Sequence, residues 1–150
     1  MNKTSVSVVS IGIGRKDYSV NVEYSVQPLI RSWQDKYSYS NLIPVAAGAE
    51  VITVIPIPAA DLYILYDLNI SAEKNVLLRL QVDEWDPVTL AWIDAVFVKS
   101  GYQRVDLQIP DGFIFGDQYR VRVKNYSAFN LTIPLDISGI KASKANYTSS

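Results

Sequence analysis

Residues 119–124 read Tyr-Arg-Val-Arg-Val-Lys, and this alternation of apolar and charged side chains decides the fold class. Successive side chains of a β-strand point to opposite faces, so the stretch predicts a strand with one buried and one solvent-facing side. The same period of two recurs at residues 18–26, 104–109 and 129–137. Half-exposed strands of this kind are typical of antiparallel sheets.

Three further runs carry apolar side chains on both faces. Residues 50–58, 62–70 and 90–98 place apolar side chains at consecutive positions as well as at alternate ones. Such strands either lie centrally beneath loops or present their second face to another subunit, because a soluble monomer rarely exposes large apolar patches. The subunit interpretation is our working hypothesis.

Turn-forming residues separate the strand-like runs. They are Gly14–Asp17, Ala46–Gly48, Ala72–Asn75, Asp86–Pro87, Ser100–Gly101, Pro110–Gly112 and Gly116–Asp117. The spacing predicts nine or ten strands in an all-β fold, an antiparallel two-sheet sandwich of jelly-roll type. The adjacent apolar residues Val8 and Val9 interrupt the alternation of the first run, which predicts a β-bulge.

One stretch has helical spacing. Pro28 at a first turn, followed by Trp33 and Tyr37, predicts at most one short helix, and a long ordered loop is the alternative. The chain shows no internal repeat and no linker. We therefore predict a single sandwich domain over residues 1–140 and a polar C-terminal tail over residues 141–150.

Composition excludes several classes of function. The 150 residues include neither cysteine nor histidine, which removes disulfides, thiolate chemistry, His-centred proton relays and nearly every transition-metal site. Fourteen basic and fifteen acidic residues give a net charge of −1, which predicts no attraction to nucleic acid. We also expect no cofactor, no membrane span and no cleaved leader, because strand-like alternation begins close to Met1.

The carboxylates do not form a recognisable catalytic pair. The candidates are Asp61, Asp67, Asp94, Asp106 and Asp136. Glycoside hydrolysis needs two acids that face one cleft, whereas most of these fall on outward positions or strand ends. Asp94 shares a strand face with Trp92, and if it is buried it needs an arginine or backbone donors as partners. We predict no catalytic residue and no enzyme activity.

Asp83, Glu84 and Asp86 form an acidic cluster around Trp85. Loop carboxylates of sandwich domains often bind Ca²⁺, so these three are the candidate metal ligands, although they lack the spacing of a calcium loop. A solvated hairpin turn is the alternative, and it is the one we favour, so no metal is predicted.

Aromatic residues in loop-like contexts are candidates for an interface. They are Trp33, Tyr37, Tyr39, Trp85 and Tyr147. Aromatic rings bury much apolar area with few rotatable bonds, which suits protein and carbohydrate partners alike. A basic stripe of Arg120, Arg122 and Lys124 marks one strand face, which we expect to face solvent or to pair with acids of a neighbouring subunit.

Asparagines occur unusually often in N-x-[ST] sequons. The candidate glycosylation sites are Asn2, Asn69, Asn125, Asn130 and Asn146. The competing explanation is that asparagine, serine and threonine share polar strand faces and turns. An intact mass equal to that of the bare 16.8 kDa chain excludes glycosylation.

Pro44–Val51, Gly116–Ser127 with its opening Gly-Asp turn, and the ending Leu135–Gly139 have a common style of short strands and tight turns. In this they resemble small β-sandwich virion proteins of phages and archaeal viruses, among them capsid, decoration and spike proteins. The resemblance implies a homo-oligomer, often a trimer, that is attached to other shell proteins and lacks catalysis.

The sequence thus predicts a virion structural protein that acts by self-assembly through apolar and aromatic interfaces. The alternative is a carbohydrate-binding or adhesive module, such as a subunit of a cell-surface filament. The expected location is the virion, or the extracellular space or cell surface in the second case.

Overall fold

The computed structural model describes the backbone of residues 3–13, 16–25 and 34–149, and the side chains of residues 35–145. Over these ranges the chain forms strands almost throughout, with one 3₁₀ turn at Lys144–Asn146. The strands are β1 (Lys3–Ile13), β2 (Lys16–Ser25), β3 (Gln34–Val45), β4 (Glu50–Ile55), β5 (Asp61–Ser71), β6 (Leu77–Asp86), β7 (Ala91–Tyr102), β8 (Arg104–Phe115), β9 (Tyr119–Asn125), β10 (Leu131–Ser143) and β11 (Tyr147–Ser149). The described part contains no helix with the length and hydropathy needed to cross a bilayer.

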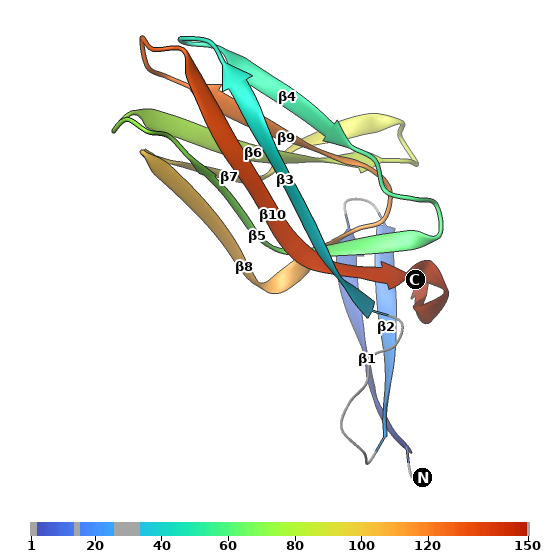
Figure 1. Ribbon diagram of the computed structural model, residues 1–150. Helices are drawn as coiled ribbons and strands as arrows, with labels where there is room; N and C mark the ends of the chain where they lie inside the picture. The colour runs from blue at the N-terminus through green and yellow to red at the C-terminus, as the bar shows by residue number, and fades with distance from the viewer. Residues whose placement is uncertain (1–2, 14–15, 26–33, 150) are drawn as a thin grey trace.

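Strands β3 to β10 form two four-stranded antiparallel sheets that face each other (Figure 1). The first sheet has the order β3-β10-β5-β8 and the second has the order β4-β9-β6-β7. The pairs are nested along the chain, because β3 pairs with β10, β4 with β9, β5 with β8 and β6 with β7. A long hairpin rolled into two layers gives this nesting, which is the topology of a jelly roll. The predicted fold class is therefore confirmed.

The remaining strands form a three-stranded sheet in the order β1-β2-β11. The register of β1 against β2 shifts between Val6 and Val9, which confirms the predicted bulge. Strand β10 continues to Ser143, and Tyr147–Ser149 pairs with β2, so much of the segment predicted as a tail belongs to sheets. Residues 26–33, which hold most of the predicted helix, lie outside the described residues, and the rest of that stretch begins β3.

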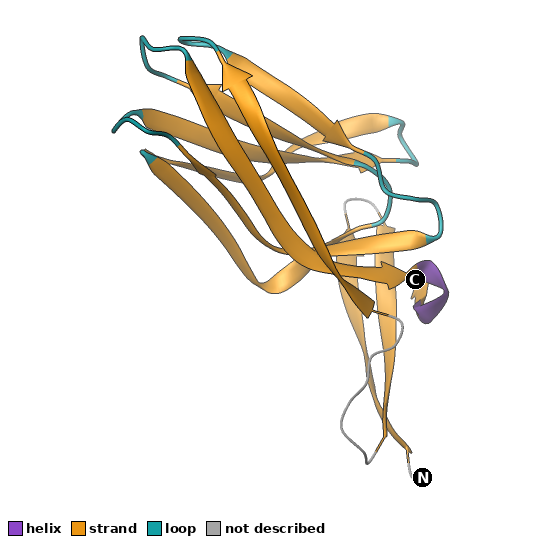
Figure 2. Ribbon diagram, viewed as in Figure 1, coloured by secondary structure: helices purple, strands orange, loops and turns teal. Residues whose placement is uncertain are grey.

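Alternating side chains of the two sheets fill the space between them. On the central strands β6 and β9, Leu78, Leu80, Val121 and Val123 are fully buried, while the residues between them point outward. Burial of a side chain of this size stabilises the fold by about 1.5–3 kcal/mol. Figure 2 shows that the loops lie at the two ends of the sandwich.

Gly139 allows a close approach between two strands. It lies where β10 shifts its register against β5. A Cβ atom at this position would overlap the backbone carbonyl group of Ile64, which is itself held in the sheet. The local packing therefore requires glycine.

Tyr37 does not occupy an exposed interface position, contrary to the sequence prediction. Its side chain is buried, its hydroxyl group lies 3.0 Å from the hydroxyl group of Tyr119, and its ring packs on Tyr63 with 4.2 Å between centroids. Burial raises the pKa of Tyr37 and of Tyr119. Both phenols are therefore neutral, and the pair is an internal polar contact.

Tyr37→Phe is expected to lower the free energy of unfolding by about 1–2 kcal/mol, because the Tyr119 hydroxyl group loses its partner in a dry environment. Urea denaturation at neutral pH measures the change. Tyr39→Phe is the control, since Tyr39 is half-buried and its hydroxyl group only accepts a long 3.4 Å contact from Asn41. Equal losses in the two variants contradict this assignment.

The strands with two apolar faces divide into two groups. On β5, Leu62, Leu65 and Leu68 are fully buried within the subunit, and Tyr66 is 37% exposed. Ile52 and Val54 on β4 and Val98 on β7 remain exposed. The hypothesis of uncovered apolar strand surface therefore applies mainly to the second sheet, because the aliphatic side chains of β5 are covered within the subunit.

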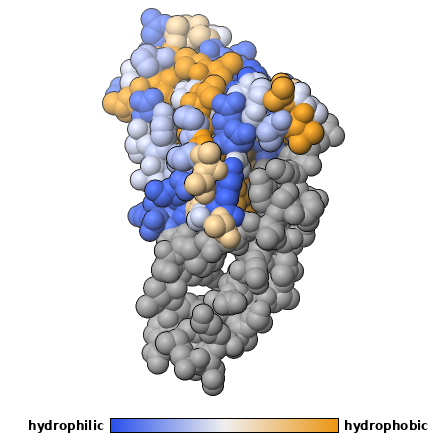
Figure 3. Space-filling model, turned by 90° about the vertical axis from the view of Figure 1, so that its right-hand side faces the viewer, coloured by the Kyte–Doolittle hydropathy of each residue, from blue (hydrophilic) through white to orange (hydrophobic). Residues whose placement is uncertain are grey.

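The turn between β6 and β7 also exposes apolar side chains. Val88 is 69% exposed and Leu90 is 72% exposed. Figure 3, which views the molecule from the right-hand side of Figure 1, shows apolar patches next to strongly polar ones. The uncovered apolar surface is thus not confined to the sheet faces.

Candidate functional site

The outer face of the second sheet carries an ordered network of charged groups, which we call the charged face. It is built by outward side chains of all four strands: Glu50, Arg79, Gln81, Asp83, Asp94, Arg120, Arg122 and Lys124. The alternation of β6 and β9 places these groups outside because their neighbours in sequence fill the core. The register brings Asp83 opposite Arg120 and Gln81 opposite Arg122.

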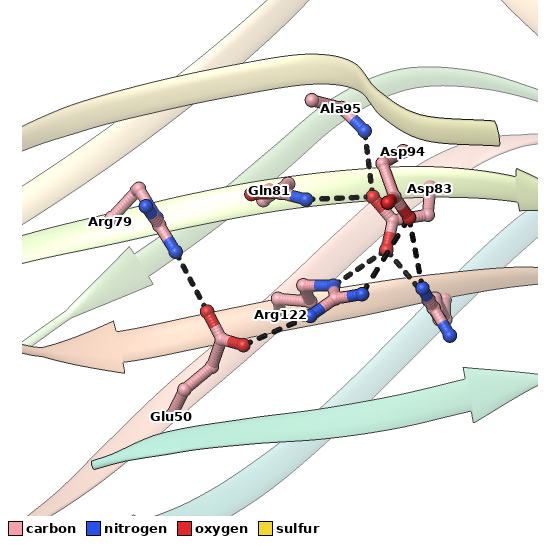
Figure 4. Close-up of polar contacts among 8 residues, drawn as sticks. Glu50, Arg79, Gln81, Asp83, Asp94, Ala95 and Arg122 are labelled. Carbon is pink, nitrogen blue, oxygen red and sulfur yellow. Dashed lines mark hydrogen bonds and ion pairs between the residues drawn. The ribbon is translucent and has the colours of Figure 1, made fainter. Parts of the chain in front are cut away.

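Asp83 is the centre of the charged face and is completely buried. Its Oδ2 atom accepts hydrogen bonds from Nε of Arg120 and Nε of Arg122, both at 2.6 Å. Its Oδ1 atom accepts from Nε2 of Gln81 at 2.9 Å and from the backbone N–H of Ala95 at 2.8 Å (Figure 4). Burial by itself raises the pKa of Asp83, but these four donors outweigh it and lower the pKa to about 2.

An irregularity in β7 supplies the backbone donor. The register of β6 against β7 shifts between Val82 and Glu84, and Ala95 has a φ of 54°. This local conformation directs the N–H of Ala95 at Asp83. Next to Ala95, Asp94 forms a 3.0 Å ion pair with Arg120, and its side chain is 65% exposed. An arginine partner was expected for Asp94 if it were buried; the partner is present, although Asp94 is exposed.

Glu50 links the network to the edge strand β4. Its two carboxylate oxygens accept from Arg79 at 2.8 Å and from Arg122 at 3.1 Å. Burial raises the pKa of Glu50, but the hydrogen bonds from the two guanidinium groups exceed this effect and lower the pKa. The hydrogen bond to Asp83 raises the pKa of Arg122, burial lowers it, and the hydrogen bond to Glu50 raises it further, so that the pKa is raised overall. The carboxylates and the guanidinium groups of the network are therefore all charged at neutral pH.

Apolar side chains border the charged face. On β4, Ile52 is 46% exposed and Val54 is 48% exposed, and each lies next to an arginine of β9. On β7, Val98 is 53% exposed and lies opposite Gln81. The polar centre is thus flanked by exposed aliphatic side chains on both edge strands.

Two tryptophans continue the border at one end. The ring of Trp92 lies 4.3 Å from the guanidinium carbon of Arg120, and Trp85 packs edge-on against Trp92 with 5.3 Å between centroids. Trp85, a predicted interface residue, is half-buried at this place. The contact with Arg120 thus ties the Trp92 ring to the ion network, and Trp85 packs against that ring. Tyr39, another predicted interface residue, is half-buried on β3 of the first sheet.

Two other predicted interface residues lie wholly or partly outside the described residues. Trp33 lies outside the described residues. Tyr147 belongs to β11 by its backbone, and its side chain lies outside the described residues.

The acidic cluster is divided between the two sides of β6. Asp83 points outward to its arginines, whereas Glu84 and Asp86 follow the inward positions and are each 2% exposed. The prediction of a solvated turn is therefore wrong for all three. Asp86 accepts from the N–H of Val88 at 2.9 Å and from Oγ1 of Thr89 at 3.0 Å. Within the described residues, no group of three or more acidic side chains is arranged to hold a metal ion.

One predicted glycosylation site is wrong on structural grounds. Asn125 is fully buried, and its Nδ2 group donates to the carbonyl groups of Val45, Ala46 and Phe129 at 2.7–3.3 Å. A glycan on that nitrogen has no space in the folded chain.

The other sequons differ in accessibility. Asn130 is exposed, with its Oδ1 atom accepting from the N–H of Ala47. Asn69 is half-buried and donates to Asp67. Asn2 and the side chain of Asn146 lie outside the described residues. Asn130 is thus the sequon whose described environment best suits modification.

The basic stripe was visible in the sequence, but its partners were not. Arg120 and Arg122 pair with Asp83 of the same subunit, instead of facing solvent or the acids of a neighbour. Arg79 was expected as a possible neighbour of the stripe, whereas Glu50 was missed as a member of the same cluster. The available signal was their position on outward sites of predicted strands, which does not by itself give the strand order.

The sequence matches no known family model, and no curated protein matches it. Among solved structures, the Yersinia pseudotuberculosis-derived mitogen is similar with a TM-score of 0.42 and 11% identity, over 69% of this chain and 85% of that chain. A protein of Bacillus endospore appendages, described as disulfide-linked pili, gives 0.39 and 15% over 73% and 86%. VP2 of infectious bursal disease virus gives 0.35 and 8% over 91% of this chain but 41% of that chain. These similarities concern the fold alone.

Proposed function

We propose that the protein is a structural subunit of a virion that acts by self-assembly, with the charged face as a contact between copies. The observation that carries this proposal is the outer face of the second sheet, on which a buried ion network lies between the exposed side chains of Ile52, Val54 and Val98. The role requires no catalytic residue, and the sequence contains neither cysteine nor histidine.

The composition of the charged face favours a protein contact over exposure to water. Arginine and tryptophan are enriched in the centres of protein interfaces. The guanidinium groups of Arg120 and Arg122 are already oriented by Asp83, so a contact does not have to order them. A solvated sheet face needs neither a buried carboxylate nor exposed aliphatic neighbours.

The distribution of charge on the charged face is self-complementary. Lys124, near one end, forms no ion pair with a described carboxylate, whereas Asp94 at the other end keeps an exposed carboxylate. Ile52, Arg122 and Gln81 lie side by side on neighbouring strands. A two-fold axis along this line of residues brings Lys124 of each copy towards Asp94 of the other. Isologous contacts in homo-oligomers have this reciprocal pattern. The trimer implied by the resemblance to virion proteins is a separate prediction about the complete assembly.

Sedimentation and native mass spectrometry test the proposal. The wild-type chain is expected to form an oligomer, and the double variant Ile52→Glu/Val54→Glu is expected to be monomeric with an unchanged circular dichroism spectrum. Leu42→Glu is the matched control, because Leu42 is 65% exposed but lies on β3 of the other sheet. An oligomer that persists in the double variant shows that another surface is used. A wild-type monomer, alone and with added shell proteins, overturns the assembly role.

A further inference from the structure

Four loops meet at the end of the sandwich opposite the β6–β7 turn, at the upper left of Figure 1. They connect β3 to β4, β5 to β6, β7 to β8 and β9 to β10. Backbone hydrogen bonds tie neighbouring loops together, from Gly48 to Ser127, from Tyr126 to Leu77 and from Gln103 to Val76. We call this surface the loop end.

Asn125 fixes the geometry of the loop end. Besides its three donated hydrogen bonds, its Oδ1 atom accepts from the N–H of Ser127 at 2.9 Å and from the hydroxyl group of Ser127 at 2.6 Å. The N–H of Ala47 adds a 3.0 Å bond to Asn130 across the same pair of loops. The loop end is therefore ordered before any ligand arrives, which lowers the entropic cost of binding.

Aromatic rings and ammonium groups alternate on this surface. Tyr126 is 44% exposed and Phe129 is 49% exposed. The Nζ atom of Lys124 lies 4.9 Å from the centroid of Tyr126, and that of Lys74 lies 4.6 Å from the centroid of Phe129. Tyr102, at 68% exposure, lies at the end of β7 beside the same loops. Neither lysine forms an ion pair with a described carboxylate of its own chain, and Lys74 lies outside the charged face.

We propose that the loop end binds an anionic carbohydrate. Aromatic faces suit the C–H surfaces of a pyranose ring, and an ammonium group next to each ring provides a partner for a carboxylate on the sugar. Of the two glutamates nearby, Glu50 is paired with Arg79 and Arg122. Glu73 is therefore the one glutamate near the loop end whose negative charge would repel an anionic ligand. The site shares Lys124 of β9 with the charged face, whereas Lys74, Tyr126 and Phe129 lie in the loops and belong to this site alone.

A carbohydrate fits these observations better than a phosphate group or a bilayer. Phosphate recognition usually employs arginine forks or clustered backbone N–H groups, whereas the cations that lie closest over the two exposed rings are lysines. Anchoring in a bilayer employs side chains that project into the lipid, whereas Tyr126 and Phe129 lie against the lysine side chains and are only about half exposed. A flat ring that bears a carboxylate matches both the rings and the charges.

An NMR titration of the full chain with sialyllactose, and with lactose as the neutral probe, tests the proposal. Sialyllactose is expected to shift the amide signals of the loop end, and lactose is expected to bind about tenfold more weakly. Lys74→Gln/Lys124→Gln is expected to reduce the affinity for sialyllactose to that for lactose. Lys141→Gln, which changes an exposed lysine on β10, is expected to leave it unchanged.

Three results overturn the proposal. They are equal binding of the two sugars, unchanged affinity in the double lysine variant, and an absence of binding by wild type. Binding to phosphatidylserine vesicles that is lost in the double lysine variant, without sugar binding, assigns the surface to lipid instead. The Ile52→Glu/Val54→Glu variant must keep its sugar affinity, which separates this site from the assembly face.

Discussion

At about pH 8, Glu84→Gln is expected to be more stable than the wild-type chain, whereas at about pH 5 the two are expected to differ little. Glu84 is 2% exposed, and neither of its carboxylate oxygens has a hydrogen-bond partner among the described residues. It lies opposite Tyr119 on the inner side of the second sheet. Burial, with a smaller contribution from the negative charge of Asp86, raises the pKa of Glu84 from 4.5 to about 7.

The direction follows from proton linkage. A carboxyl group whose pKa is raised in the folded state holds its proton more tightly there than in the unfolded chain. The stability that this provides is complete below about pH 4.5 and is lost as the pH rises to about 7. The shift corresponds to about 3 kcal/mol. Glutamine cannot ionise, so the stability of the variant does not fall in this way as the pH rises.

Urea denaturation of both chains across this pH range measures the effect. Burial and the neighbouring Asp106 also raise the pKa of Asp67, so the informative quantity is the difference between the wild-type and variant profiles. Asp117→Asn, at an exposed position, is the control and is expected to retain the wild-type profile. A variant profile as steep as that of wild type rules out Glu84 as the source. Histidines do not contribute, because the chain has none.

The fold was predictable because the information lies in local alternation. Residues 119–124 alternate in sequence, and in β9 the same residues alternate between the core and the outer face. The bulge at Val8 and Val9 was predictable for the same reason. Pro110–Gly112, however, is not a turn between strands but lies within β8, close to a register shift against β5. Gly112 has a φ of +73°, and turns and bulges both use this conformation, so the local signal does not distinguish them.

The candidate site was predictable only in part because its contacts join distant strands. The sequence indicates a basic stripe, but the pairing of Asp83 with Arg120 and Arg122 depends on β6 lying next to β9. A strict period of two over residues 83–86 assigns Asp83 to one face and Glu84 to the other. Treating these residues as one acidic cluster therefore missed that assignment. Strand order at long sequence separation is not encoded in such a pattern.

The replacement Asp83→Asn is expected to lower the free energy of unfolding by about 3 kcal/mol, near the lower end of the range for breaking a buried ion pair. The amide removes the charge that two guanidinium groups share, and those groups are only 15% and 21% exposed. Because water reaches them poorly, it does not replace the lost partner. Urea denaturation at neutral pH provides the measurement.

Asp94→Asn is the matched control, because Asp94 pairs with the same arginines but is 65% exposed. We expect it to cost less than about 1 kcal/mol. Acid denaturation gives a second test. A carboxyl group with a lowered pKa stabilises the fold above its ordinary value of 3.8, and this contribution is lost as the pH falls to about 2. The Asp83→Asn chain should therefore lose less stability than wild type between these values.

A double-mutant cycle with Arg122→Met distinguishes pairing from loss of packing. The two changes are expected to be non-additive by about 1–3 kcal/mol, since each removes the same 2.6 Å contact. Additive losses mean that the arginine stem, and not the ion pair, stabilises the outer face. In that case the guanidinium groups are not held in place by Asp83, and the proposed assembly lacks the preorganised contact surface that it requires.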